Sequence, residues 1–485
     1  MQTSKLTAQE LAAAINKQNI HLEDLAAAVS CRCCAAAEKY NAFIDFDPAI
    51  IDREIIRIAG MLQNGEEASL AGVPYALADN ICTAVIKTTC ASRMLSSYQF
   101  PFEAATAQRL KENGALLTGK TNMDEFAMSA SGENSCFGAV KNPRNGKHTA
   151  GSGAAAAVAY GAVTFALEQD RCGELRQSAS YCGALGLKPT YGRISRSGLV
   201  EFAPSLEQIG IIAMKTADLA ATLAIISGPD PLDPTSCSVD VPAYPELLHG
   251  KAKHIKVAVP DCWSETAYLE EVIKNIFTAK LQEMREDIFQ VEIVSLPFFR
   301  YAPVTAAIIS AVEAFSSLSN YDGVRFGFRE AGKHLQEMYR QTRTEGFSSS
   351  LKQLLTFGAM VSSGKFYHDY FLKAQKMRTL IKQELEECLG EYDLIVLPTT
   401  PFRAPALKNG FKECLLPDPA ASYTAAANLA GLPALTFPVF MQDAAGGINT
   451  AGLHFMTKPW DEAILLQAAL SLEKINPVTF SEPQL

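Results

Sequence analysis

Short apolar runs alternate with amphipathic stretches along most of this chain. Apolar runs bounded by turn residues are typical of buried strands, whereas apolar positions three or four residues apart indicate helices. Strands are predicted at 72–77, 115–118, 256–260, 290–297 and 393–398. Helices are predicted at 105–113, 152–167, 216–227, 265–287, 366–389 and 420–429. This interleaving favours an α/β fold, with a large mixed central sheet covered by helices on both faces.

The N-terminal region is predicted to be helical. Thr7 and Glu10 have the spacing of a capping box, so a first helix begins there and a second follows over 21–40. Because no internal repeat or low-complexity linker interrupts the chain, we expect a single domain over 1–485, with the helical region 1–60 packed on its core. A charged stretch at 323–350 is expected to be a solvent-exposed insertion.

Composition and charge restrict the class of protein. The chain has 485 residues, of which 48% are hydrophobic and 20% charged, as in folded globular proteins. The net charge of −9 argues against direct binding of nucleic acid. The N-terminus lacks the apolar core of a signal peptide, and the longest apolar stretch, about 154–167, is too short to cross a bilayer. We therefore expect a cytoplasmic protein without membrane contact.

The 12 cysteines are expected to be reduced thiols in that compartment. Cys31, Cys33 and Cys34 lie close together in sequence, but a second pair that would complete a zinc site does not accompany them. Cys33 continues a helical apolar stripe with Leu25 and Val29, which indicates a small buried side chain. The sequence thus predicts neither a metal nor a cofactor.

Several motifs together carry a family resemblance. Between His148 and Tyr191 the chain reads HTAGSGAAAAVAYGAVTFALEQDRCGELRQSASYCGALGLKPTY. With GVPYALADNI from Gly72, MDEFAM from Met123 and NLAGLP from Asn428, this run resembles the amidase signature family. The MDEFAM, GENS and CASRML pieces are most similar to the GatA group, the glutamine-hydrolysing subunits of Glu-tRNA(Gln)/Asp-tRNA(Asn) amidotransferases. The resemblance covers nearly the whole chain and implies the amidase signature fold.

The same resemblance implies a Ser–Ser–Lys site whose three positions are changed here. A serine hydroxyl is a weak nucleophile, so the family uses a neutral lysine, relayed through another serine, to remove its proton. Backbone N–H groups near the nucleophile then stabilise the oxyanion. Ala78 stands at the position of the lysine, Ala150 at that of the relay serine and Glu174 at that of the nucleophile. Glutaminase and amidase activity are therefore predicted to be absent.

The resemblance also identifies positions for substrate contacts. In the GatA group an arginine on a helix and an aspartate before the NLAGLP segment hold the charged α-groups of glutamine. Their counterparts here are Gln353 and Ala421. Without these counter-charges the site is expected to bind free glutamine poorly. A vestigial pocket is predicted to include Ser131, Asp170, Cys172 and Gly173.

Three functions stay open at this point. The favoured one is a pseudoenzyme that binds or assembles with the other amidotransferase subunits, GatB and GatC, in the formation of Gln-tRNA or Asn-tRNA, because the framework is kept while the catalytic positions differ. The second is a working amidase with a rebuilt site, in which Glu174 or Cys172 is the nucleophile. His148 would then be the nearest base, and Lys87 and Lys120 the nearest lysines. The third is a non-catalytic sensor of a small molecule.

Overall fold

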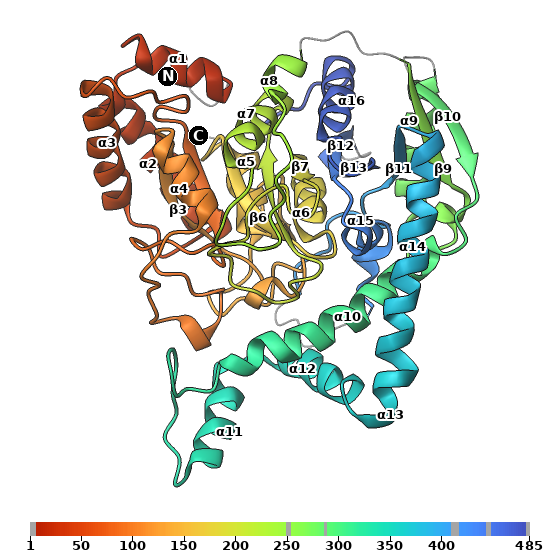
Figure 1. Cartoon of the computed structure of the whole chain (residues 1–485). Helices are drawn as coiled ribbons and strands as arrows, with labels where there is room; N and C mark the ends of the chain where they lie inside the picture. The colour runs from red at the N-terminus through yellow and green to blue at the C-terminus, as the bar shows by residue number, and fades with distance from the viewer. Residues whose placement is uncertain (1–5, 249–253, 286–288, 409–416, 443–447, 482–485) are drawn as a thin grey trace.

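One mixed sheet of eleven strands runs through the part of the chain that the computed structural model describes, residues 6–248, 254–285, 289–408, 417–442 and 448–481 (Figure 1). The strand order is β1-β3-β2-β6-β8-β7-β12-β13-β11-β9-β10. The strands are β1 (Phe43–Ile44), β2 (Pro74–Ala78), β3 (Leu116–Thr121), β6 (Phe165–Asp170), β7 (Leu185–Lys188), β8 (Gln208–Ala213), β9 (Ile255–Pro260), β10 (Phe289–Val294), β11 (Leu394–Pro398), β12 (Ala434–Gln442) and β13 (Ile448–Met456). Strands β3, β2 and β6 are parallel, as are β10, β9 and β11, and the other pairs are antiparallel.

Most of the sheet is buried on both faces, and the edge strand β10 is partly exposed. In β11, Leu394 and Val396 belong to one hydrophobic core, whereas Ile395 and Leu397 belong to a second. Successive side chains of a strand point to opposite faces, so a strand between two cores is a continuous apolar run. This explains why the predicted strands lacked the alternation of a half-exposed sheet.

Helices supply the rest of both cores. The first core includes side chains of α1 (Ala8–Asn16), α2 (Leu22–Tyr40), α3 (Pro48–Gln63), α4 (Ala105–Glu112), α5 (Gly153–Tyr160), α6 (Glu174–Cys182), α7 (Thr216–Ile226), α8 (Tyr244–Leu247), α9 (Glu271–Arg285) and α16 (Glu462–Ile475). The second includes those of α10 (Ala302–Ser317), α12 (Ser349–Val361), α14 (Leu372–Glu391) and α15 (Ala425–Ala430). The predicted α/β fold with helices flanking a large mixed sheet is thus confirmed.

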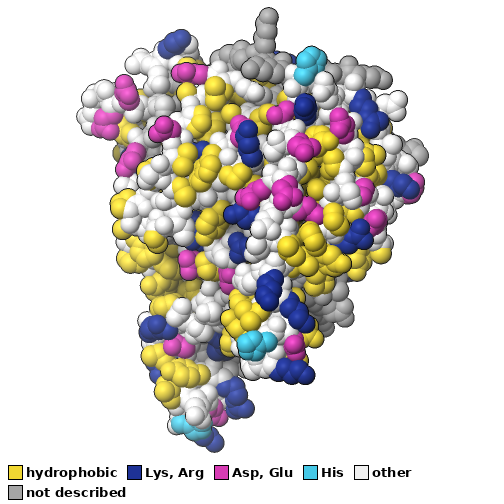
Figure 2. Space-filling view, turned by 45° about the vertical axis from the view of Figure 1, so that its right-hand side comes forward, with side chains coloured by type: hydrophobic (Ala, Val, Ile, Leu, Met, Phe, Trp, Pro, Cys, Tyr) yellow, Lys and Arg dark blue, Asp and Glu magenta, His cyan; other side chains and the backbone are white. Residues whose placement is uncertain are grey.

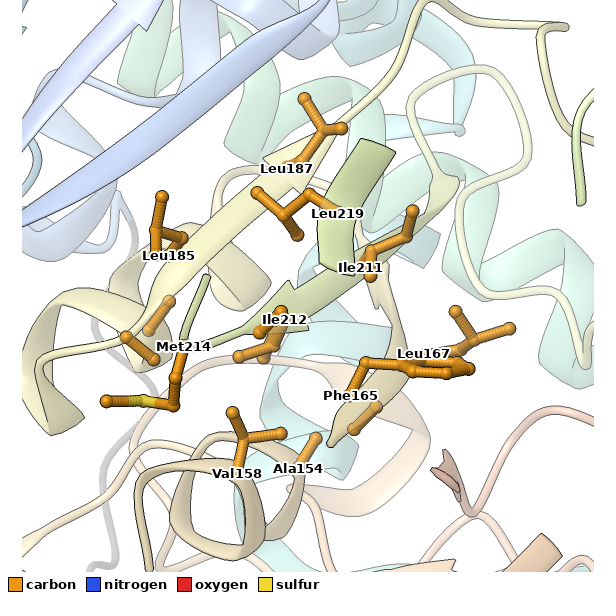
Figure 3. Packing of buried hydrophobic residues seen from close by; sticks show 14 of the residues in the cluster. Ala154, Val158, Phe165, Leu167, Leu185, Leu187, Ile211, Ile212, Met214 and Leu219 are labelled. Atoms are coloured by element: carbon orange, nitrogen blue, oxygen red, sulfur yellow. The ribbon is translucent and has the colours of Figure 1, made fainter. Parts of the chain in front are cut away.

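Around β6, β7 and β8 the first core is densely packed (Figure 3). Phe165 and Leu167 of β6 lie with Ala154 and Val158 of α5, and Leu219 of α7 joins the same cluster. Strands β6 and β7 both pair with β8, and α5 packs on β6. This packing holds the ends of β6 and α6, where the candidate site lies.

The helix predicted over 152–167 is wrong in its second half. Ser152 caps α5 by accepting the N–H of Ala155 at 3.3 Å, but the helix ends at Gly161, whose φ of 78° is left-handed. After that turn the chain enters strand β6. The apolar run therefore contains a short buried helix and a buried strand, and periodicity alone does not distinguish these within one run.

The other predicted elements are present, with shifted ends. The capping box of Thr7 and Glu10 is confirmed, as is the second helix. α9 begins at Glu271, and residues 286 and 287 of that prediction lie outside the described residues. α14 begins only at Leu372, after a π-helical turn, and α15 begins after the 3₁₀ turn Pro419–Ser422.

The predicted insertion at 323–350 contains a helix, α11 (Leu335–Gly346), which projects beyond α10 in Figure 1. Its middle is exposed, but both ends are attached to the body. The N–H of Phe328 donates to the carbonyl of Met94 at 2.7 Å, and Phe347 is buried against Phe126. The segment is therefore a tethered projection.

One helical stretch of the described chain, Phe299–Asn320, has the length and apolar composition of a membrane span, a test that core helices of soluble proteins also pass. Its main helix, α10, packs against α12, α14 and α15. On the face shown in Figure 2, acidic and basic side chains are interspersed.

Candidate functional site

Two of the predicted site positions lie where neighbouring parallel strands end. β2 and β6 pair in parallel, and their last residues are Ala78 and Asp170. Both positions therefore lie at the same edge of the sheet. Helix α6 begins at Glu174, directly after the loop 171–173. The carboxyl edge of parallel strands is where α/β folds most often place ligand sites.

The third position, Ala150, lies on the loop that precedes α5, and this loop contacts α6. Its neighbour Gly151 is in contact with α6, because a Cβ built there would lie 3.0 Å from the Cα of Ser178, one turn beyond Glu174. Ala78, Ala150 and Glu174 are 1%, 0% and 5% exposed. All three predicted triad positions are thus buried, and of the three only Glu174 lines the cavity described below.

The Glu174 carboxylate is fully engaged by the loop that precedes it. Its Oε2 accepts the backbone N–H of Arg171 at 2.8 Å and that of Cys172 at 2.7 Å. Its Oε1 accepts from the Arg171 guanidinium, from Nη2 at 2.8 Å and from Nε at 3.2 Å. Charge-assisted hydrogen bonds of this kind are roughly twice as strong as neutral ones. The Glu174 side chain therefore occupies the hydrogen-bond donors of loop residues 171 and 172.

Arg171 was not among the predicted site residues. It is 7% exposed and has further partners besides Glu174. Nη2 donates to the carbonyl of Met128 at 2.7 Å, Nη1 donates to Ser310, and the guanidinium lies 4.9 Å from the centre of the Phe202 ring. The available signal was an arginine three residues before a glutamate at a helix start, a spacing that permits an ion pair.

Cys172 is placed as an unreactive thiol. It is 7% exposed, and burial raises the pKa of its thiol to about 12. The thiolate is the nucleophilic form of cysteine, and its fraction at neutral pH is very small when the pKa is so high. The geometry therefore gives no support to Cys172 as a nucleophile.

A cavity of about 740 Å³ opens beside this loop. Its wall includes three residues of this loop and helix start, Arg171, Cys172 and Glu174. Ser131 and His148 also line it. Other ionisable side chains on its wall are Glu133, Arg144, Tyr181, Tyr268, Glu270, Arg403, Lys408 and Asp418. The volume lies within the range of small-molecule sites.

Ser131 is hydrogen-bonded to the buried carboxylate of Asp124. Its hydroxyl donates to Oδ2 of Asp124 at 2.8 Å, and its N–H donates to the same oxygen at 2.8 Å. Asp124 also accepts the N–H of Asn134 at 2.9 Å. These bonds fix the loop shape, which agrees with a structural role for Asp124.

Asp170 and Gly173, predicted as pocket residues, support the loop from behind the cavity. Asp170 is fully buried and forms an ion pair with Arg176, with Nε to Oδ2 at 2.8 Å and Nη2 to Oδ1 at 2.8 Å. Burial alone would raise the pKa of Asp170, but the Arg176 guanidinium holds it below its ordinary value. Oδ1 also accepts the N–H of Gly173 at 3.0 Å. Gly173 has a φ of 116°, a left-handed conformation that favours glycine.

The two predicted substrate positions have different outcomes. Ala421 lies on the cavity wall, where its methyl group provides no charge. Gln353 lies on the exposed face of α12, and the helix faces the cavity with Leu354 instead. Leu354 and Ala421 are both apolar. The assignment of Gln353 and Ala421 as the substrate positions stays a prediction. Asp418 is a charged group nearby, and burial raises the pKa of its carboxyl to about 6.

The remaining candidate bases are scattered. His148 lies on the cavity wall, and its Nδ1 has no hydrogen-bond partner among the described residues. Lys87 is exposed on a loop. Lys120 is buried. Its amine donates to the Ile81 carbonyl and, at 2.9 Å, to the hydroxyl of Thr88, and so stabilises the segment 81–88. Within the described residues, no group of three or more His, Cys, Asp or Glu side chains is arranged to hold a metal ion.

Fold and site together define a member of the amidase signature family. The family model described as Amidase matches residues 24–466, so the chain belongs to this family. The chain is 40% identical to the GatA subunit of the glutamyl-tRNA(Gln) amidotransferase of Moorella thermoacetica, over 100% of this chain and 99% of the relative.

Solved structures agree with this assignment. The crystal structure of the corresponding glutamyl-tRNA(Gln) amidotransferase subunit from Thermotoga maritima is 30% identical, with a TM-score of 0.77, and the match covers 99% of this chain and 98% of that one. A peptide amidase from Stenotrophomonas maltophilia shares the fold at 24% identity, with a TM-score of 0.79 over 98% of this chain and 99% of the other.

Proposed function

We propose that this chain is a non-catalytic relative of GatA that serves as a binding or assembly component in tRNA-dependent amidation. The observation that carries the proposal is the Glu174 carboxylate, which occupies the N–H groups of Arg171 and Cys172. Glu174 stands where the family has its nucleophile. The proposal includes one domain over 1–485 that works in the cytoplasm.

Amide hydrolysis needs groups that this site does not offer. The nucleophile requires a base, and the developing oxyanion requires unoccupied N–H donors. Ala78 and Ala150 have no group that could serve as base or relay. Since the Glu174 carboxylate already accepts the loop N–H groups, a tetrahedral oxyanion would have to displace it. These features support loss of hydrolysis.

The similarity to GatA relatives supports partnership with GatB and GatC. By name these relatives are parts of a glutamyl-tRNA(Gln) amidotransferase, and their similarity runs over the full length of the chain. The identity to these relatives is 39–40% over 99–100% of the chain, although the predicted catalytic positions differ. A retained assembly role explains this combination.

A rebuilt amidase is less well supported. A carboxylate whose oxygens already accept two backbone and two guanidinium hydrogen bonds is a poor nucleophile. The sensor function has one observation in its favour, the cavity of about 740 Å³ beside the loop. A bound small molecule there would be compatible with the absence of turnover.

The proposal is tested by purifying the chain with tagged GatB and GatC from the same genome and by measuring ammonia release from glutamine. We expect a stable complex without ammonia release above a blank. Glu133→Ala is the matched control, because Glu133 lines the same cavity outside the loop. Turnover that Glu174→Ala or Cys172→Ala abolishes and Glu133→Ala spares would establish the rebuilt amidase. A chain that elutes alone would remove the assembly role and favour the sensor.

A further inference from the structure

We propose that the backbone of residues 171–172 and the Arg171 guanidinium form a binding site for a carboxylate, in which Glu174 is a tethered occupant. When the Glu174 side chain is shortened, a free small monocarboxylate should enter from the cavity and take its place. In the wild-type chain this end of the cavity is therefore closed to carboxylate ligands. Ligand binding at this site does not depend on assembly with partners.

The site satisfies both oxygens of a carboxylate. The two backbone N–H groups converge on one oxygen at 2.8 and 2.7 Å, and the guanidinium reaches the other at 2.8 and 3.2 Å. A guanidinium that faces a carboxylate with two N–H donors gives directional recognition as well as energy. The chemistry of the site thus selects a planar monoanion with two oxygen atoms.

The donors are held in place by groups other than Glu174. Arg171 keeps its bond to the carbonyl of Met128, its bond to Ser310 and its position over the Phe202 ring. Behind the loop, Asp170 accepts the N–H of Gly173, and Arg176 fixes Asp170 in turn. Removal of the Glu174 carboxylate should therefore leave a preorganised site, which lowers the cost of binding a ligand.

The cavity gives a ligand access to the site. The atoms that each substitution removes determine the size of the ligand that fits. Arg171, Cys172 and Glu174 all line the cavity, so solvent and solutes can reach them. Glu174→Ala removes a CH₂–COO⁻ fragment, which corresponds to acetate. Glu174→Gly removes one further methylene, which corresponds to propionate. The two variants should thus differ in their preferred ligand.

The test measures thermal unfolding in sodium acetate, propionate or chloride at neutral pH and constant ionic strength. We expect acetate to raise the Tm of Glu174→Ala by several degrees in a saturable way. Propionate should be the better ligand of Glu174→Gly. The wild type, Glu133→Ala and the double variant Arg171→Met/Glu174→Ala should not respond beyond chloride.

If Glu174→Ala does not fold without a ligand, the readout is its soluble yield after refolding in acetate against chloride, where acetate should restore folding. The proposal is overturned if acetate acts equally on the wild type and Glu174→Ala, or if it has no effect on either readout. A response that survives in the Arg171→Met double variant also overturns it. Ammonia release is measured in parallel, so that a failure of the proposed function is seen separately.

Discussion

Glu174→Ala should destabilise the folded chain although the substituted residue contributes no apolar core packing. The substitution leaves Arg171, whose side chain is 8% exposed, without its counter-charge. It also leaves the N–H groups of Arg171 and Cys172 without the acceptor that they have in the native loop. Both consequences arise in a buried region, where unpaired polar groups are costly.

The magnitude follows from these contacts. Breaking a buried ion pair by removing one partner typically costs about 3–5 kcal/mol. Here Arg171 keeps its bonds to Met128 and Ser310, and water can reach the loop from the cavity. We therefore expect a loss of about 2–4 kcal/mol in the free energy of unfolding. Glu174→Gln keeps an acceptor for the two N–H groups and should cost only about 1–2 kcal/mol.

The assay is denaturant unfolding of the wild type, Glu174→Ala, Arg171→Met and the double variant. Because the two side chains interact directly, the double variant should be more stable than the sum of the single effects predicts, by about 2 kcal/mol. The expected role of this ion pair is refuted if Glu174→Ala lies within ~0.5 kcal/mol of the wild type. It is also refuted if the two single effects are additive.

Three further predictions concern the site and its surroundings. The variant A78K/A150S/E174S should recover at most a trace of glutaminase activity, because Gln353 and Ala421, the positions predicted to hold the charged groups of glutamine, carry no charge. Rapid ammonia release would show that the substrate pocket is intact. Alkylation of Cys172 by iodoacetamide should be slow at pH 7–8 and faster toward pH 11, because burial raises the pKa of this thiol to about 12. Peptide mass spectrometry follows the labelling. Rapid labelling at pH 7, comparable to that of the exposed Cys31 of α2, would contradict this. Glu168 of β6 is buried and accepts the Ser152 hydroxyl at 2.8 Å, and burial raises the pKa of its carboxyl to about 8. The folded state therefore holds a proton that the unfolded state loses, and stability should fall as pH rises from about 5 to 8. Glu168→Gln should flatten this dependence in denaturant unfolding, and an unchanged slope would refute it.

Much of the fold could be predicted because the parallel and buried strands are uninterrupted apolar runs. β9 and β11 were predicted to within a residue or so from such runs. The helix over 152–167 failed because a fully buried helix and a fully buried strand have the same apolar composition, and only Gly161 marks the turn between them. Six strands of the sheet were not predicted as strands: β1, β6, β7, β8, β12 and β13.

The motifs predicted the positions of the site, but they did not predict its geometry. The structure places Gly151, next to Ala150, against Ser178 of α6, but the match of Ala150 and Glu174 to the family's serines stays a prediction. The sequence did not reveal that Glu174 folds back onto its own loop, because that depends on the left-handed turn at Gly173 and on the position of Arg171. On α12, Gln353 is exposed whereas the adjacent Leu354 lines the cavity, so an error of one residue in matching a helix changes which side chain is assigned to the cavity.

The central claim is that this chain contributes binding without glutamine hydrolysis, and one measurement tests it most directly. The chain is reconstituted with GatB, GatC and misacylated Glu-tRNA(Gln), and amidation is followed with either ammonium chloride or glutamine as the nitrogen donor. We predict amidation with ammonium and none with glutamine. Amidation with glutamine at a rate comparable to that with ammonium would contradict the claim.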